Sequence, residues 1–207
     1  MVSTSHRLSA RELRVLGGLL EKQRTTPDQY PLTLNSLRLA CNQSTNRDPV
    51  VGYSEEQVRD AVQRLGHIGW APLATGPGSR VAKYRHLFDE ALGLDSHETA
   101  LLALLMLRGP QTAAELKARS ERLARFGGVA EVTSVLGRLD QRELAHLLPR
   151  RPGQREERWT HLLASEPLEP AAAVEPDEPA PLERRVARLE EQLQELQRAL
   201  AERGLLD

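Results

Sequence analysis

The residue types that usually carry out catalysis are present, but their spacing matches no catalytic site. The six histidines lack the spacing of metal ligands. The single cysteine, Cys41, lies in an apolar stretch, where a small buried thiol is more common than a nucleophile. The sequence contains no phosphate-binding loop, nucleophile elbow or dinucleotide-binding fingerprint. We therefore expect a protein that is not an enzyme and that needs no metal and no cofactor.

Basic side chains offer a different chemistry, which is contact with the phosphate backbone of DNA. Lys83 and Arg85 would share one face of a strand, because successive side chains of a strand point to opposite faces. Arginine and lysine are common partners of phosphate groups. The candidate nucleic-acid contacts are Arg47, Arg59, Arg64, Arg80, Lys83 and Arg85. A solvated hairpin whose charges only aid solubility has the same pattern, so both interpretations stay open.

A second candidate site is the polar run NQSTNRDP at residues 42–49. It lies where a helix-turn-helix usually has only a tight turn, and the second half of the chain has no counterpart of this length. Loops of this kind often carry a binding function. We consider it a candidate loop for a partner or ligand, and we expect its loss to damage binding more than stability. Its candidate contacts are Asn42, Gln43, Asn46, Arg47 and Asp48.

The elements that must position these residues come from a diverged internal duplication. Two copies of the same pattern follow each other, and each is the size of a small domain. SEEQVRDAVQRLGHIGWAPLA at 54–74 aligns with GVAEVTSVLGRLDQRELAHLL at 128–148, GSRVAKYRHL at 78–87 with GQREERWTHL at 153–162, and LSARELRVLGGLL at 8–20 with LDSHETALLALLM at 94–106.

Each copy reads as three helices followed by two short strands. The first helix begins at a capping box, Ser9 with Glu12 or Asp95 with Glu98. The second helix begins at Thr33 or Thr112, and the third shows apolar residues at helical spacing. The strands are expected at 70–74 and 81–88, and at 144–148 and 158–163.

This order is typical of a winged helix-turn-helix. The predicted fold is mainly α with small β-hairpins (α+β), with winged-helix domains at residues 1–92 and 93–164. The segment ALLALLMLRG is apolar nearly all round, so we expect it to pack against the first domain or a second chain.

The C-terminal part has a different composition. Residues 165–181, SEPLEPAAAVEPDEPAP, are predicted to be a linker rich in Pro, Ala and Glu. In residues 182–207, apolar residues recur at alternating intervals of four and three positions. This spacing indicates a heptad helix and favours a homodimer. A lone helix that folds back on the body is the alternative.

The charge balance permits nucleic-acid binding without requiring it. The formal net charge is −1, with the acidic excess in residues 165–207. No window approaches ~18 uninterrupted apolar residues, as a membrane span would need, and the N-terminus lacks the apolar core of a signal peptide. We therefore expect a cytoplasmic protein that does not enter a membrane.

The long motif EKQRTTPDQYPLTLNSLRLACNQSTNRDPV, followed by GSRVAKYRHL and a C-terminal heptad helix, resembles the YceH family of uncharacterised bacterial proteins. The resemblance covers nearly the whole chain apart from the linker. It implies two tandem winged-helix domains, and it implies no activity and no site residues.

Two functions remain in view. The leading hypothesis is a DNA-binding or transcription-regulatory protein without enzyme activity, whose partner is double-stranded DNA. The alternative is a protein–protein adaptor that uses winged helices as docking modules. The adaptor hypothesis is supported by the acidic residues Glu55, Glu56 and Asp60 in the third helix of the first copy, because they would repel phosphate.

We predict that deleting residues 182–207 converts the protein from a dimer to a monomer, because the deletion removes the heptad seam. Size-exclusion chromatography with light scattering on both proteins measures this change. An unchanged oligomeric state after the deletion would contradict the coiled-coil prediction.

Overall fold

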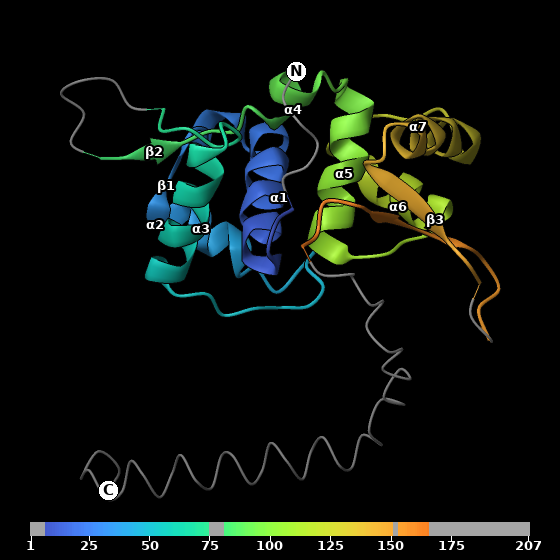
Figure 1. The fold of residues 1–207 in the computed structure, drawn as a ribbon, viewed down its shortest axis with the longest axis horizontal. Coiled ribbons are helices and arrows are strands. Elements are labelled where there is room, and N and C mark those ends of the chain that lie inside the picture. The colour runs from blue at the N-terminus through green and yellow to red at the C-terminus, as the bar shows by residue number, and fades with distance from the viewer. Residues whose placement is uncertain (1–6, 75–80, 151–152, 166–207) are drawn as a thin grey trace, which may run out of the picture. The chain divides into compact units, whose positions relative to one another are not determined.

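The computed structural model describes residues 7–74, 81–150 and 153–165, which form a mostly helical body with two small antiparallel strand pairs (Figure 1). The first repeat contains α1 (Ala10–Thr25), a 3-10 turn (Pro27–Gln29), β1 (Leu32–Thr33), α2 (Leu34–Cys41), α3 (Glu55–His67), β2 (Lys83–Tyr84) and α4 (Phe88–Leu92). The second contains α5 (Ser96–Arg108), α6 (Ala113–Ser120), α7 (Val129–Gln141), β3 (Ala145–Leu148) and β4 (Arg158–His161). The predicted class, mainly helical with small strand pairs, agrees with this architecture. The predicted linker and heptad helix lie outside the described residues.

Capping boxes start the helices where the sequence predicted them. The Ser9 N–H donates to the Glu12 carboxylate at 2.7 Å, while the Ser9 hydroxyl oxygen accepts from the Glu12 N–H. These bonds satisfy backbone donors that the first helical turn cannot pair. The same arrangement opens α5 at Asp95 and Glu98 and α6 at Thr112 and Glu115, and a further box, Ser54 with Gln57, opens α3.

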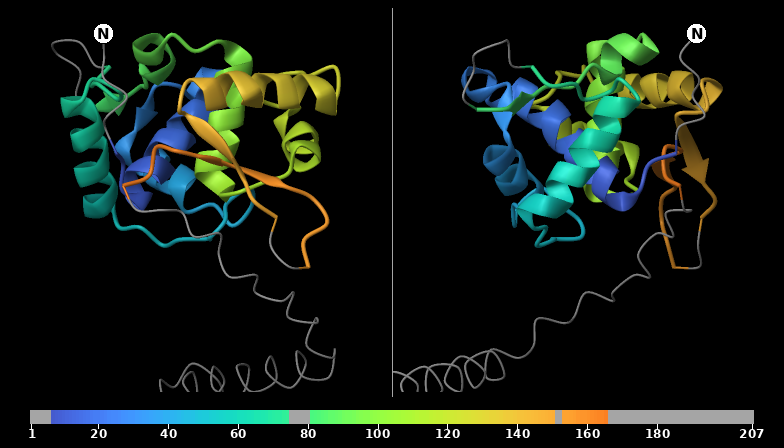
Figure 2. Two further views of the ribbon diagram at one scale, coloured as in Figure 1. Left: turned by 45° about the vertical axis from the view of Figure 1, so that its right-hand side comes forward. Right: turned by 60° about the vertical axis from the view of Figure 1, so that its left-hand side comes forward.

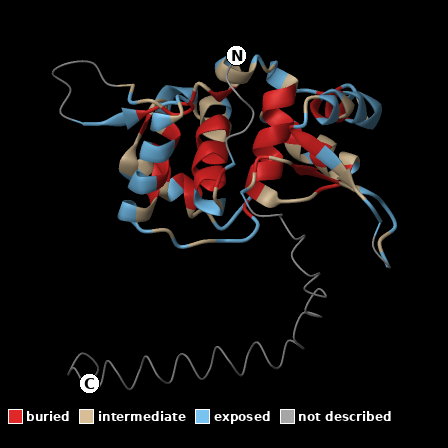
Figure 3. Ribbon diagram, in the orientation of Figure 1, coloured by how far each residue is buried: buried red, intermediate tan, exposed pale blue. Residues whose placement is uncertain are grey.

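The centre of the core is the contact between α1 and α5, the first helices of the two repeats. Figure 3 shows both helices buried along most of their length, and Figure 2 shows them at the centre of the body from two other directions. The prediction that the apolar segment of α5 packs against the first repeat is confirmed. Gly17 permits the close approach, since a Cβ there would lie 2.9 Å from Leu107 Cγ and 3.2 Å from Met106 Cβ.

A second connection joins the start of the first repeat to the end of the second. The Leu8 N–H donates to the Leu163 carbonyl at 2.8 Å, and the Ser165 N–H donates to the Leu8 carbonyl at 2.8 Å. Leu8 itself is buried. The two repeats are therefore held together by backbone hydrogen bonds as well as by the core.

The strands of the first repeat differ from the prediction. The strand expected at 70–74 is reduced to a bridge between Leu73 and Tyr84, and β2 pairs instead with β1, which the sequence did not reveal. Pro72 explains part of the difference, because it has no N–H to donate to a strand ladder. The expected strand 81–88 is shortened to Lys83–Tyr84, and its last expected residue, the buried Phe88, begins α4.

The second repeat follows the prediction more closely. β3 and β4 form the expected hairpin, with Ala145 opposite His161 and Leu148 opposite Arg158. An isolated bridge between Gln111 and Trp159 occupies the place that the β1–β2 pair has in the first repeat. The duplication seen in the sequence is therefore present in the pairing of the backbone.

Equivalent histidines lie buried in the two repeats, in agreement with a structural role. The backbone N–H of His86 donates to the Tyr30 hydroxyl at 2.7 Å, and His86 Nε2 lies 2.8 Å from Gln23 Oε1. Burial lowers the pKa of His86 and lowers the pKa of His161 to about 4. Desolvation disfavours the charged form, so His161 is neutral at pH 7.

We predict that Gly17→Ala destabilises the protein by about 1–3 kcal/mol, because the added methyl group forces α1 and α5 apart. Gly18→Ala is the matched control, since its Cβ would meet no atom closer than 4.0 Å. That change should be neutral or stabilising by up to ~1 kcal/mol, because alanine favours a helix over glycine. Urea unfolding midpoints of the two variants measure the difference. Equal effects would show that the helix contact at Gly17 tolerates a side chain.

Candidate nucleic-acid interface

The segment around β2 presents two predicted basic residues to solvent. Lys83 and Arg85 are exposed, whereas Tyr84 and His86, which alternate with them along the chain, are buried, as the period-two alternation predicted. The pairing of β2 with β1 and a hydrogen bond from the Ala74 N–H to the Lys83 carbonyl at 2.8 Å hold this orientation. Neither basic side chain forms an ion pair with any residue that the structure describes. Arg80 lies in the segment 75–80, outside the described residues.

The predicted basic residues of α3 are both paired with carboxylates. Arg59 contacts Glu55 at 2.7 Å, one helical turn away, and Arg64 Nε donates to Glu12 at 2.7 Å. The first turn of α3 exposes Glu55 and Glu56 to solvent. These charges oppose a phosphate at the N-terminus of the helix. The structure therefore places Arg59 and Arg64 at the surface but leaves α3 without excess positive charge.

The ion pair of Arg64 is repeated in the second half of the chain. Arg138, which aligns with Arg64, lies 2.9 Å from Asp95 and 3.4 Å from Glu98, the residue that aligns with Glu12. In both repeats an arginine near the end of the third helix holds the capping box of the first helix. This recurrence favours a packing role for Arg64.

Arg47 is buried, which does not suit the phosphate contact predicted for it. Its guanidinium forms a two-point ion pair with the Glu21 carboxylate, at 3.1 and 2.5 Å. It also donates to the carbonyl of Ala40 and to Gln43 Oε1. The side chain has no solvent exposure. Arg47 therefore ties the polar loop to the ends of α1 and α2.

The rest of the polar loop is also anchored. The Asn42 side chain pairs with both backbone groups of Tyr53, at 2.8 and 2.9 Å. The Asp48 N–H donates to the Leu107 carbonyl at 3.0 Å, and Arg108 donates to Asn46 Oδ1 at 3.2 Å. Because these bonds reach α5, the loop connects the two repeats. This geometry argues against our expectation that its loss would damage binding more than stability.

The sequence also gave no indication of two partners of this loop, the buried Arg14 and the half-buried Glu21. Arg14 of α1 donates to the carbonyls of Cys41 and Pro49, at 3.2 and 2.7 Å, and Glu21 accepts from Arg47. Both side chains come from the helix that the sequence predicted from its capping box. Only a charged residue on the buried side of that helix could have signalled them.

The structure shows the surroundings of the single cysteine and of the possible metal ligands in the described part of the chain. Cys41 is buried, and burial raises the pKa of its thiol to about 12. A thiol with this pKa stays protonated and is a poor nucleophile. Among residues 7–74, 81–150 and 153–165, no three His, Cys, Asp or Glu side chains gather as metal ligands would. In the same ranges, no helix is long and apolar enough to cross a membrane.

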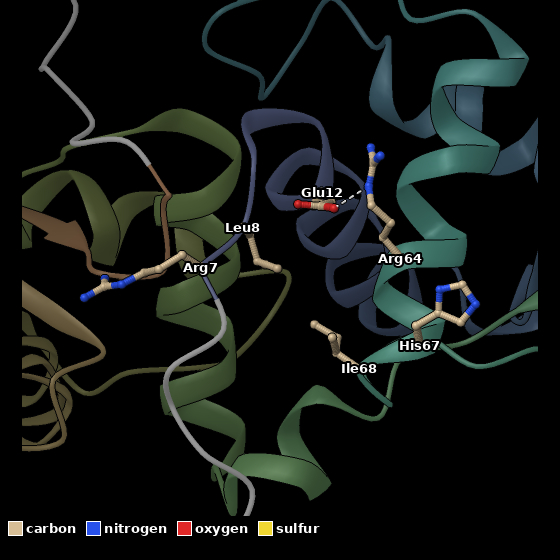
Figure 4. Close-up of a pocket in the computed structure, with 6 residues that line it drawn as sticks. All are labelled: Arg7, Leu8, Glu12, Arg64, His67 and Ile68. Carbon is tan, nitrogen blue, oxygen red and sulfur yellow. Dashed lines mark hydrogen bonds and ion pairs between the residues drawn. The ribbon is translucent and has the colours of Figure 1, made fainter.

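One pocket was not predicted. It has a volume of about 260 Å³ and lies between the start of α1 and the end of α3 (Figure 4). Leu8 and Ile68 form its apolar part, Glu12 and Arg64 lie beside them, and Arg7 and His67 complete its lining.

Comparison with known proteins places the chain in a family. A family model described as "Protein of unknown function, DUF480" matches residues 8–154, which include most of both repeats. The chain belongs to the DUF480 family. The predicted resemblance to a family of uncharacterised bacterial proteins is confirmed at this level.

Relatives of the chain among known proteins carry the description "UPF0502 protein". The protein of Dechloromonas aromatica is 43% identical over 215 residues, which cover 99% of each chain. That of Solibacter usitatus is 45% identical over 194 residues, 93% of this chain and 94% of the relative. That of Chromobacterium violaceum is 49% identical over 174 residues, 83% of this chain and 79% of the relative. These descriptions name no activity, so the function must be argued from the residues.

We predict that Arg47→Met destabilises the protein by about 3–5 kcal/mol, because it leaves the largely buried Glu21 carboxylate without its partner. Arg59→Met is the matched control and should cost no more than ~0.5 kcal/mol, since its ion pair with Glu55 is exposed. Chemical unfolding of both variants provides the measurement. A change at Arg47 as small as that at Arg59 would show that the loop does not depend on this ion pair.

Proposed function

We propose that the chain is a DNA-associated regulatory protein without enzyme activity, built from two tandem winged-helix domains. Support for the winged-helix assignment comes from the order of elements in the first repeat, which is α1, β1, α2, α3 and then β2 with its bridge to Leu73. The resemblance to the YceH family points the same way. In such folds the wing commonly contacts the DNA backbone.

The observation that carries the proposal is that some of the predicted basic residues are paired with carboxylates and others are not. Arg47, Arg59 and Arg64 are neutralised by carboxylates of the same chain. Lys83 in β2 and Arg85 just after it are exposed and have no such partner among the described residues. The wing is therefore the part of the predicted interface that keeps its positive charge for a phosphate.

This distribution implies binding to the DNA backbone with little reading of bases. Base recognition in winged helices usually needs the third helix in the major groove. The exposed acidic side chains of α3, Glu55, Glu56 and Asp60, oppose its approach to DNA. Contacts from the wing alone would be independent of sequence and sensitive to salt.

A protein–protein adaptor is the second candidate function. The acidic face of α3 favours it, because a helix that repels phosphate can still dock against a protein surface. Its partner would meet α3, whereas DNA would meet the wing. A dimer formed through residues 182–207 would present two copies of either surface.

We predict that the double variant Lys83→Glu, Arg85→Glu loses binding to a mixed-sequence duplex, measured by fluorescence anisotropy across a salt series. For the unaltered protein, affinity should fall steeply with salt, because phosphate contacts release counterions. Replacing only Lys83 and Arg85 with neutral glutamine should reduce the slope of log K against log salt by about 2.

Arg122→Glu with Arg125→Glu is the matched control, because both arginines are exposed and the change in net charge is the same. This variant should keep more of its affinity than the wing variant. Equal losses would indicate an effect of net charge rather than of the wing. Absence of binding by the unaltered protein at low salt would reject the DNA proposal, and capture of one stoichiometric protein partner would then support the adaptor.

A further inference from the structure

Apolar side chains accompany the basic residues around β2. Leu73 is 57% exposed and Val81 is 52% exposed, although burial of such side chains is favourable. Both belong to the antiparallel pairing around β2, in which Leu73 bridges to Tyr84. We call residues 72–74 and 81–85 the β2 ribbon. One exposed apolar residue needs no explanation, but two on a small ribbon beside unpaired cations indicate a contact surface.

The structure keeps these two apolar side chains outside the core. β2 pairs with β1 on one side and with residues 72–74 on the other, so it is the central strand of the ribbon. Tyr84 is buried, whereas Lys83, Ala82 and Val81 are all exposed. The alternation of buried and exposed residues therefore stops at Lys83, and the chain no longer packs on the body beyond this point. Figure 1 shows β2 at the outer side of the first repeat, away from α5.

The second repeat lacks this combination of side chains. Arg158 aligns with Lys83, but it is paired with Glu115 at 3.0 Å. Glu156 aligns with Val81, and it places a negative charge where the first repeat has an apolar group. The exposed apolar and basic side chains are therefore not a requirement of the fold, because the equivalent hairpin forms without them.

DNA is the partner that the charges of the ribbon favour, and its minor groove suits the apolar side chains. Lys83 and Arg85 have no carboxylate partner among the described residues, so they complement a polyanion. Leu73 and Val81 cannot form the side-chain hydrogen bonds by which the major groove is usually read. Proteins that bind the minor groove commonly insert apolar side chains there. Narrow, A·T-rich minor grooves also have a strongly negative potential, which attracts arginine and lysine.

We propose that the β2 ribbon enters the minor groove of DNA, with Leu73 and Val81 inside the groove and Lys83 and Arg85 on the phosphates beside it. This inference rests on the proposed function, since it requires the ribbon to bind DNA. Phosphate contacts alone are independent of sequence. The 2-amino group of guanine, however, lies in the minor groove and would oppose an apolar side chain. The ribbon therefore prefers A·T to G·C base pairs.

The test measures the affinity of the full chain for three duplexes of equal length, in which the central base pairs are A·T, G·C or I·C. Inosine lacks the 2-amino group of guanine, so an I·C pair resembles A·T in the minor groove and G·C in the major groove. The A·T and I·C duplexes should bind alike and about tenfold more tightly than the G·C duplex, a difference of ~1.4 kcal/mol. Binding of the I·C duplex like the G·C duplex would place the contact in the major groove and overturn the proposal.

Leu73→Ser with Val81→Ser is the decisive variant. It should lose the preference for the A·T and I·C duplexes but keep the weaker, salt-dependent binding to the G·C duplex, because its basic residues are unchanged. Leu39→Ser with Val50→Ser is the matched control, since these side chains are of the same types and are 55% and 58% exposed. The control should keep the tenfold preference. A folded Leu73→Ser, Val81→Ser variant that also keeps it would reject the site.

The remaining outcomes separate this inference from the proposed function. Equal binding of all three duplexes would reject the minor-groove site and leave the DNA-associated function standing, whereas no binding to any duplex at low salt would reject both. An anionic lipid surface is the other partner that suits apolar and basic side chains together. Co-sedimentation with vesicles of phosphatidylserine and phosphatidylcholine tests it. Vesicle binding that the Leu73→Ser, Val81→Ser variant loses, with its DNA binding unchanged, would overturn the proposal.

Discussion

The contact between α1 and α5 is the interaction on which the rest of the structure depends. These helices hold equivalent places in the two repeats, and each buries residues on nearly every side. Gly17 lets them approach closely, and the backbone bonds of Leu8 with the end of the second repeat close the same unit. Each repeat alone would expose the apolar face of its first helix to water. Packing one face on the other removes that cost, since the free energy of burial grows with apolar area.

The same constraint explains where the charged residues of the first repeat are used. Arg14 and Arg47 lie at the buried end of the first repeat, where they satisfy carbonyl groups that water does not reach. A buried polar group without a partner costs about 1–3 kcal/mol, so these bonds matter more than surface ion pairs. Arg14 and Arg47 therefore serve internal hydrogen bonding and not a basic surface. Lys83 and Arg85, in contrast, are exposed, while the neighbouring Tyr84 and His86 are buried.

The duplication supplies an internal comparison that a single domain would lack. Where the two repeats agree, as in the pairs Arg64 with Glu12 and Arg138 with Glu98, the shared feature belongs to the fold. Where they differ, one copy shows what the other has lost or gained. Ile68 opposite Arg142 and the long polar loop are two such differences. The loop acts as a connection between repeats, and the pocket is lined by Ile68, where the second repeat has Arg142 paired with Glu98.

The sequence by itself determined the local structure of this protein. Its capping boxes, helical spacing and internal repeat predicted the starts of α1, α2, α5 and α6, the buried face of α5 and the second hairpin, because these features depend on neighbours along the chain. It also placed Lys83 and Arg85 on one face, since alternation is a property of a strand.

Only the tertiary structure decided which basic residues stay exposed and without a carboxylate partner. The partner of Arg47 is Glu21 and the partner of Arg64 is Glu12, each far away in the sequence, and no local pattern announces such pairs. The short strand β1 and the pocket at Ile68 could not be predicted from the sequence for the same reason, because both exist only where distant segments meet. A charge acts on a ligand only if folding leaves it in solvent without a partner, and that condition is set by packing rather than by residue type.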